Sequence, residues 1–179
     1  MLLVFWGPDD EFIPSVKVSR VAVFWDASSR LQFEELQRAA RVLGVQLGPI
    51  ELHDPYDFTA AFTAAKKMRA GAVMVLFSPA FIQQRTNIAK LAVGNKLPTI
   101  CQDTVEVTAG CLVSYGPSSS ELFQRTAYYI DRLLRGERAA DLPVEQSSKF
   151  RLLVNLRTAK SLGITIPESI LLRADEVIR

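Results

Sequence analysis

Residues 112–167 read LVSYGPSSSELFQRTAYYIDRLLRGERAADLPVEQSSKFRLLVNLRTAKSLGITIP, and this stretch has the pattern of strands alternating with helices. Its apolar start, 112–114, predicts a strand. Residues 115–118 predict a polar turn that ends the strand, because Gly tolerates unusual φ angles and Pro cannot donate in a ladder. Apolar residues at helical spacing predict a helix over 120–135, followed by a strand over 150–156. A strand whose polar turn leads into a helix start is a common ligand-site arrangement in α/β folds.

The pattern upstream of this stretch alternates strands and helices. Apolar runs without polar alternation predict strands buried on both faces of a parallel sheet. The runs 21–25 and 71–77 are of this kind. Residues 45–52 and 98–101 predict two further strands, and Gly48 and Pro49 indicate an edge position or a bulge in the first of them. Amphipathic segments lie between them, so the order predicts right-handed βαβ units. We therefore expect an α/β fold, a Rossmann-like three-layer open parallel sheet.

Composition and charge exclude several classes of function. The chain is 49% hydrophobic and 22% charged, which is an ordinary globular balance. The net charge is +2 and the basic residues are scattered, so no nucleic-acid partner is expected. The two cysteines, Cys101 and Cys111, and the single histidine, His53, do not form a metal motif. We expect no metal site and no cofactor.

The N-terminal residues do not have the pattern of an export signal. Residues 1–6 are a short apolar run without a basic region before it, and the acidic residues 9–11 follow soon after. No stretch approaches the roughly 20 apolar residues of a membrane span. If the chain as given is complete, we expect it to stay in the cytoplasm.

The ligand site of an open parallel sheet lies at the carboxyl ends of its strands. The candidate ligand-binding residues at those ends are Trp25, Asp26, Ser28, Phe77, Ser78, Asp103, Ser114, Tyr115 and Ser118. Hydroxyls and helix-start N–H groups would hold a carboxylate, acidic side chains an ammonium, and aromatic side chains an apolar group. The same residue types also serve as ordinary caps and turns of such a sheet, so both interpretations stay open.

Catalysis has little support in the sequence. Cys101 or Cys111 would need His53 as a base to act as a nucleophile, and nothing in the sequence brings them together. The chain has no Gly-x-Ser-x-Gly elbow, P-loop or Gly-x-Gly-x-x-Gly fingerprint. The two cysteines would instead be able to form a disulfide if the protein is exported. We expect no enzyme activity, and a hydrolase or transferase in the same crevice stays a minor alternative.

Several segments resemble one protein family in the right order. They are GCLVSYGPS (110–118), DLPVEQ (141–146), NLRTAK (155–160), LGI (162–164) and LLRADEVI (171–178). Together they resemble the ABC-transporter substrate-binding proteins of the type I periplasmic-binding fold, and within them the branch of tryptophan and tyrosine binders. The resemblance runs from about Val18 to the C-terminus. Over this range the chain resembles the second lobe of such a protein together with its return segments.

The resemblance implies a function and a division of the chain. Family members bind a small solute, such as an amino acid, between two lobes, and an ABC permease recognises the closed form. It implies a divergent segment 1–17, a Rossmann-like lobe 18–110, and a crossover segment 111–179 that packs on the lobe or on a partner. It also implies a periplasmic or extracytoplasmic location.

The helix 120–135 raises a second interpretation. In the relatives it packs on a first lobe, and here several of its apolar side chains would be exposed. Exposing a few large side chains forgoes several kcal/mol at about 25 cal/mol per Å². A homodimer through this helix would cover them. The alternative function is therefore a shortened relative that acts as an oligomeric interaction or sensory module without a transport role.

Overall fold

The fold is built on one seven-stranded sheet, in the order β2-β1-β3-β4-β5-β6-β7. The computed structural model describes residues 18–145 and 149–179, so the predicted N-terminal segment 1–17 lies outside the described residues. The strands are β1 (Arg20–Trp25), β2 (Gln46–Glu51), β3 (Ala72–Val75), β4 (Thr99–Cys101), β5 (Val113–Pro117), β6 (Phe150–Asn155) and β7 (Glu176–Ile178). Strands β1 to β5 are parallel, which confirms the predicted fold class.

The helices alternate with the strands as the sequence predicts. They are η2 (Ala27–Ser29), α1 (Arg30–Leu43), α2 (Phe58–Lys67), α3 (Pro79–Gln83), α4 (Arg85–Asn95), α5 (Thr104–Ala109), α6 (Ser119–Leu134), η3 (Ala139–Asp141), α7 (Leu156–Leu162) and α8 (Glu168–Leu171). Ser118 caps α6, since its hydroxyl accepts from the Glu121 N–H at 3.4 Å. Helices α1 and α7 end at Gly44 and Gly163, which have the positive φ that glycine favours.

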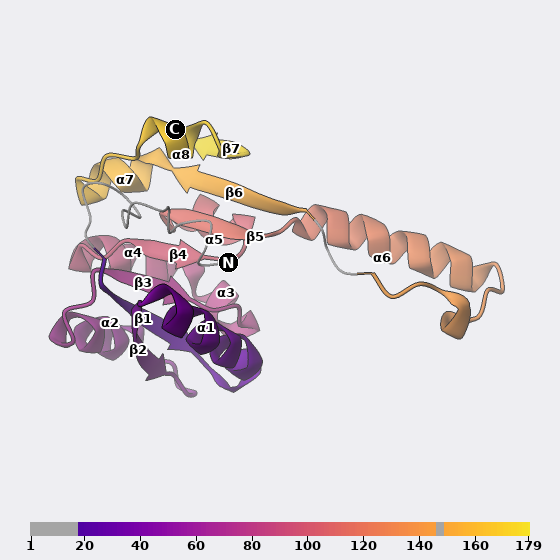
Figure 1. Cartoon of the computed structure of the whole chain (residues 1–179), viewed down its shortest axis with the longest axis horizontal. Helices are drawn as coiled ribbons and strands as arrows, with labels where there is room; N and C mark the ends of the chain where they lie inside the picture. The colour runs from indigo at the N-terminus through magenta and orange to yellow at the C-terminus, as the bar shows by residue number, and fades with distance from the viewer. Residues whose placement is uncertain (1–17, 146–148) are drawn as a thin grey trace.

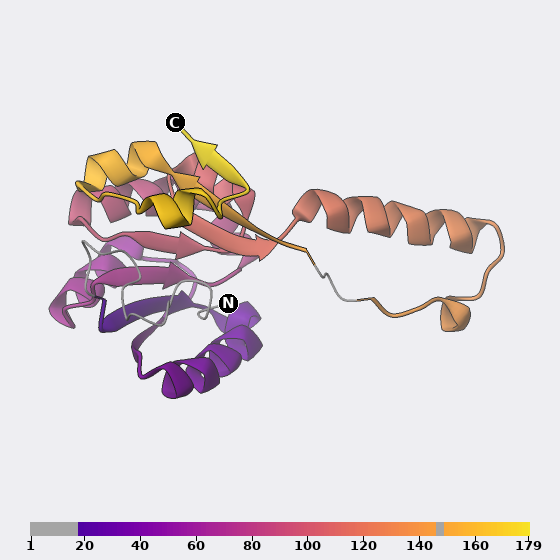
Figure 2. The same cartoon turned by 45° about the horizontal axis from the view of Figure 1, so that its top comes forward.

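Two apolar cores lie on the two faces of the sheet. Alternate residues of β1 point to opposite faces, so that Val23 joins one core and Phe24 the other. The first core packs under α1 and α7, and the second packs under α2, α4 and α5. This arrangement makes the three-layer sandwich seen in Figures 1 and 2.

The predicted turn at residues 115–118 is wrong, because β5 continues through it to Pro117. Gly116 and Pro117 pair with Arg151 and Phe150 of β6. The chain needs glycine here since a Cβ atom on Gly116 would lie 2.0 Å from the carbonyl oxygen of Gln102. The close approach of two backbones, and not a turn, is the reason for the glycine.

Strand β6 runs antiparallel to β5, although a helix lies between them in the sequence. A parallel neighbour requires the connecting helix to cross back over the sheet. Helix α6 instead extends away from the sheet, and the chain returns beside it before β6 begins (Figures 1 and 2). No residue of α6, all of which the structure describes, is buried. The segment after residue 110 therefore adds β5, β6 and β7 to the same sheet and sends only α6 and its return outward.

Candidate functional site

A groove of about 800 Å³ lies at the carboxyl ends of the parallel strands. It extends from the ends of β3 and β4 to the first turns of α6. Its lining is mostly apolar, with a few polar side chains. The lining residues are Gln32, Phe77, Pro79, Ile82, Gln83, Gln102, Asp103, Val105, Pro117, Ser119, Leu122, Phe123 and Thr126. A mostly apolar concavity with a few convergent polar groups is the common form of a small-molecule site.

Gln32 joins three parts of the groove. Its Oε1 accepts hydrogen bonds from the backbone N–H of Phe77 at 3.3 Å and from Nε2 of Gln102 at 3.2 Å. The three residues come from α1, from the end of β3 and from the end of β4. The side chain of Gln32 therefore holds the polar part of the lining together.

Asp103 links the groove to the start of α6. Its Oδ1 accepts from the Val105 N–H at 3.1 Å and caps α5, and its Oδ2 accepts from the Ser119 hydroxyl at 2.6 Å. Glu106, which is 4% exposed, accepts from the backbone N–H groups of Asp103 and Gln102 at 3.1 and 3.2 Å. The loop that carries Gln102 and Asp103 is thus fixed from both sides.

Burial sets the charge state of Glu106. Desolvation raises the pKa of its carboxyl to about 7, although the N–H groups of Asp103 and Gln102 favour the charged form. The nearby Asp103 raises it further. Glu106 therefore titrates near neutral pH.

Asp26, Ser28 and Ser78 gather in one hydrogen-bonded cluster at the ends of β1 and β3. Ser28 donates to Asp26 from its N–H at 3.0 Å and from its hydroxyl at 2.6 Å, and the hydroxyl of Ser78 also donates to Asp26. Burial opposes the charge on Asp26, yet these hydrogen bonds hold the pKa of its carboxyl below the ordinary value. The Tyr56 hydroxyl donates to the same carboxylate at 3.4 Å. Desolvation, together with the negative charge of Asp26, raises the pKa of Tyr56.

The structure brings two of the nine predicted ligand-binding residues into the groove lining, Phe77 and Asp103. Trp25 is buried and its ring stacks on Phe33, with 4.7 Å between the ring centroids. Its indole nitrogen has no hydrogen-bond partner within the described residues. Ser118 is buried as the cap of α6.

Ser114 and Tyr115 lie on β5, outside the groove lining. Ser114 is buried in the sheet between β4 and β6. Tyr115 stacks on Phe150, with 5.5 Å between the ring centroids, and lines a separate cavity of about 430 Å³ with Glu121 and Arg151. The structure therefore separates these two residues from Phe77 and Asp103.

The predicted set omits several residues that line the groove. Gln102 follows β4, and the strand-end rule that selects Asp103 also places it on the rim. Gln32 lies in the first turn of α1, where no strand-end signal marks it. Leu122 and Phe123 belong to the apolar face of α6. The spacing of apolar residues along α6 indicates only an amphipathic helix and not a ligand site.

Cys101 and Cys111 form a disulfide, with their Cα atoms 6.6 Å apart. The bond closes the segment that carries Gln102, Asp103 and Val105. Within residues 18–145 and 149–179, no cluster of three or more His, Cys, Asp or Glu side chains has the arrangement of a metal site. In the same described residues, no helix has both the length and the apolar character needed to span a bilayer.

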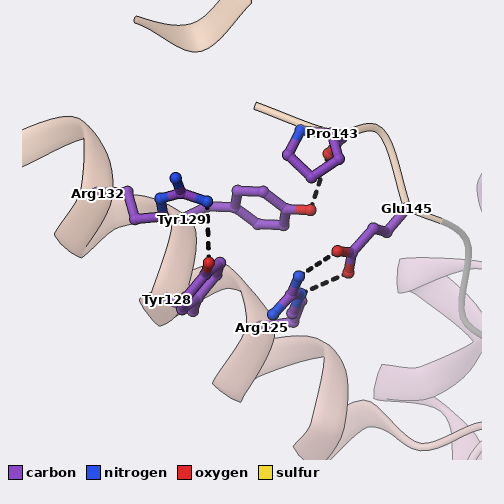
Figure 3. A network of polar contacts seen from close by, with 6 residues as sticks. All are labelled: Arg125, Tyr128, Tyr129, Arg132, Pro143 and Glu145. Carbon is purple, nitrogen blue, oxygen red and sulfur yellow. Dashed lines mark hydrogen bonds and ion pairs between the residues drawn. The ribbon is translucent and has the colours of Figure 1, made fainter. Parts of the chain in front are cut away.

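Helix α6 and the segment that follows it are joined by polar contacts (Figure 3). Arg125 forms a two-point ion pair with Glu145, and the Tyr129 hydroxyl donates to the Pro143 carbonyl at 2.8 Å. Arg132 donates to the Tyr128 hydroxyl at 2.9 Å. We call α6 with this return segment, residues 119–145, the arm.

The arm also exposes an apolar stripe, on a face of α6 other than the one that contacts the return segment. The stripe consists of Leu122, Phe123, Ile130, Leu133 and Leu134, which are 43–83% exposed. At 100° per residue these side chains share one face of the helix, and Arg125, Tyr128 and Arg132 lie on the opposite one. The stripe begins in the groove, since Leu122 and Phe123 also line it.

Comparison with solved structures shows where this fold occurs. The chain is similar to a conserved domain protein from Vibrio cholerae, with a TM-score of 0.84 and 23% identity over 98% of this chain and 57% of that one. It is similar to an ABC domain from Streptococcus pneumoniae in complex with L-Trp, with a TM-score of 0.84 and 24% identity over 94% of this chain and 58% of that one.

A third similar structure is a ligand-free, open substrate-binding protein with adhesive properties from Clostridium difficile. Its TM-score is 0.68 and its identity is 20%, over 99% of this chain and 57% of that one. The chain thus spans less than two thirds of the length of each of these three proteins. Among curated proteins, no sequence matches the chain.

The sequence also matches a family profile. The profile of the ABC transporter substrate binding proteins matches residues 10–178, so the match begins somewhat before Val18, where the resemblance was expected to start. The seven-stranded, mostly parallel sheet agrees with one lobe of such a protein. This chain belongs to the ABC transporter substrate-binding protein family.

Proposed function

We propose that the chain is a solute-binding lobe of an ABC importer and holds a small, amino-acid-like solute in the groove at the carboxyl ends of its strands. The observation that carries the proposal is the groove itself, an apolar concavity of about 800 Å³ with a few polar groups. Family membership supports the solute-binding role. The L-Trp complex of the Streptococcus pneumoniae neighbour favours an amino acid of the kind that tryptophan and tyrosine binders take.

The proposed mechanism is closure on the solute without catalysis or a cofactor. A second α/β lobe would cover the groove from the side of the arm, and an ABC permease would recognise the closed form. A solute drives closure only if it makes more favourable contacts in the closed state than in the open one. The groove between the strand ends and α6 supports this role, because it has walls on both the lobe and the arm.

The proposed location is periplasmic or otherwise extracytoplasmic. Family membership supports an extracytoplasmic site of action. The disulfide between Cys101 and Cys111 also favours an oxidising compartment, because thiols in the cytoplasm are kept reduced.

The predicted ligand-binding residues divide into two groups under this proposal. Phe77 and Asp103 would contact the solute directly, because they line the groove. Asp26, Ser28 and Ser78 would hold the ends of β1 and β3 in place next to Phe77. Trp25, Ser114, Tyr115 and Ser118 would reach a solute only after a change in shape, because they do not line the groove.

A second candidate function is an oligomeric interaction or sensory module without a transport role. The exposed stripe of α6 favours it, because a contiguous apolar face of this kind is typical of an interaction site. In this alternative a second copy of the chain would cover the stripe and form a homodimer.

Thermal unfolding with single solutes would test the first proposal. A solute at tenfold its Kd stabilises the native state by about 1.4 kcal/mol, which raises the Tm of a chain of this size by about 3–6 °C. We expect such a rise with at least one L-amino acid and none with phosphate or sugars. A Tm that no amino acid raises would contradict the solute-binding role and favour the second candidate.

A further inference from the structure

The amide groups of Gln32 and Gln102 have a fixed orientation in the groove. A backbone N–H can only donate, so the Gln32 atom that faces the Phe77 N–H at 3.3 Å is the amide oxygen. The same oxygen lies 3.2 Å from the Gln102 amide, which must therefore present its NH₂ group to it. One backbone group thus sets the direction of both side chains.

This orientation leaves the NH₂ group of Gln32 and the amide oxygen of Gln102 available to a ligand. Nε2 of Gln32 and Oε1 of Gln102 have no hydrogen-bond partner among the described residues, and both side chains line the groove. Neither atom is buried without a partner, so both have access to a bound molecule. Both groups belong to amides that are joined by a hydrogen bond of 3.2 Å, so a solute in the groove would be able to contact the two side chains together.

The charge of the groove restricts the solute further. Asp103 is the only charged side chain in the lining formed by the described residues. No lysine, arginine or histidine of the described chain lines the groove, so a solute with a net negative charge would find no counter-charge there. The remaining walls are mostly apolar, with Phe77, Ile82 and Phe123 among them.

We infer that Gln32 and Gln102 form an amide pair that binds the polar head of the solute. Nε2 of Gln32 donates to a carboxylate or carbonyl oxygen, Oε1 of Gln102 accepts from an N–H group, and Asp103 favours a protonated amine. The solute class is a zwitterion or cation with an apolar side chain, and not a dicarboxylate or a phosphate ester. This inference rests on the proposed function, and it also makes Gln32 a positioning residue for Phe77 and Gln102.

Two substitutions at one position separate these roles. Gln32→Glu keeps an oxygen that accepts from Phe77 and Gln102, but it replaces the free donor with a second acceptor. Gln32→Leu removes both the acceptor and the donor. Gln37→Glu and Gln37→Leu are the matched controls, because Gln37 lies on α1 outside the groove lining and is partly exposed.

Calorimetric titration of the chain with single L-amino acids, L-malate and inorganic phosphate provides the test. For the amino acid that the wild type binds best, we expect Gln32→Glu to raise Kd about tenfold or more, since a lost hydrogen bond and a new like charge act together on the carboxylate. Gln32→Leu should raise it at least as much, and both Gln37 variants should bind as the wild type does. The Tm of Gln32→Glu should stay close to that of the wild type, because its positioning contacts remain.

The outcomes separate this inference from the function on which it rests. If the wild type binds an amino acid and Gln32→Glu binds it equally well, the amide pair is not the recognition element. If L-malate or phosphate binds more tightly than every amino acid, the assigned solute class is wrong. If the wild type binds none of the panel, the proposed solute-binding function fails, and the inference fails with it.

Discussion

The side chain of Asp26 shows how much one buried carboxylate organises at the strand ends. It is 5% exposed and accepts hydrogen bonds from Ser28, Ser78 and Tyr56. An acidic residue after a buried strand indicates either a cap or a ligand contact, and the sequence leaves both open. In the structure the carboxylate is occupied by these neighbours, so its first role is to join the ends of β1 and β3.

Asp26→Ala should lower the free energy of unfolding by about 1–3 kcal/mol, because it leaves the buried hydroxyl of Ser78 without its acceptor and removes the hydrogen bonds that the exposed Ser28 donates. The pKa of Asp26 is lowered in the folded state, so its contribution is present at neutral pH and is lost as pH falls through the folded pKa. Urea unfolding at neutral and at acidic pH measures both effects. Asp54→Ala, at an exposed position, is the control. An equal loss for the two variants would contradict this role.

Glu106 should make stability depend on pH in the opposite direction. Its pKa is raised from 4.5 to about 7 by burial, so the folded chain binds a proton that the unfolded chain releases. Stability should therefore fall as pH rises from about 5 to about 7. Glu106→Gln keeps an oxygen for the N–H groups of Gln102 and Asp103 but does not titrate.

Thermal unfolding at several pH values measures this effect. Glu106→Gln should have a higher Tm than the wild type at about pH 8, and the difference should shrink toward about pH 5. Glu121→Gln, at the partly exposed start of α6, should leave the pH dependence of the wild type unchanged. Parallel Tm curves for Glu106→Gln and the wild type would show that Glu106 is charged throughout this range.

Among the helices and strands, the features that depend on neighbouring residues are the ones that the sequence indicates. The cap at Ser118, the helix ends at Gly44 and Gly163, and the edge position of β2 around Pro49 each depend on a few neighbouring residues, so local sequence is enough to indicate them. The course of β5 through Gly116 was not predictable, because the reason for this glycine is the carbonyl of Gln102, 14 positions earlier in the sequence.

The course of β5 also bears on the predicted ligand contacts of Ser114 and Tyr115. A strand that ends at Ser114 would place both residues at its carboxyl end, whereas a continuing strand sends successive side chains to opposite faces. The strand register puts Ser114 inside the sheet and Tyr115 against Phe150. Their role in ligand binding stays a prediction, and the groove lining favours Phe77 and Asp103.

The disulfide between Cys101 and Cys111 joins the two ends of the segment that carries the groove residues Gln102 and Asp103. Cys101→Ser combined with Cys111→Ser should lower the free energy of unfolding by about 2–4 kcal/mol, because the open loop has more conformational freedom in the unfolded chain. Denaturant unfolding with and without dithiothreitol measures the loss. The reductant should destabilise the wild type and leave the double variant unchanged. A wild type that is insensitive to the reductant would contradict a stabilising disulfide.

At the scale of the whole molecule, the order of the sheet follows from the strand and helix pattern up to β5. The antiparallel direction of β6 does not, because α6 has the amphipathic pattern of a helix that packs on its own sheet. Only the three-dimensional arrangement shows that helix α6 extends away from the sheet (Figure 2). No residue of α6, which the structure describes in full, is buried, so a second lobe or a second copy of the chain, as proposed above, would find this helix accessible.

The exposed stripe should make the isolated chain self-associate. Burying several large apolar side chains contributes several kcal/mol at about 25 cal/mol per Å². We expect sedimentation at about 100 µM to show dimers for the wild type and monomers for Ile130→Ser combined with Leu134→Ser, both exposed in α6. Leu31→Ser combined with Val42→Ser, exposed on α1, is the matched control and should stay dimeric. A wild-type chain that is a compact monomer and binds little hydrophobic dye would contradict the expected dimer.

If this lobe holds an amino-acid-like solute in the groove at its strand ends, NMR titration of the ¹⁵N-labelled chain will locate the binding residue by residue. An equimolar set of the protein L-amino acids at about 10 mM would reveal even weak binding by an open site. We expect shifts at the backbone amides of Phe77, Gln102, Asp103 and Ser119, which surround the groove. Unchanged amides at these positions, or shifts confined to the cavity beside Tyr115 and Phe150, would contradict it.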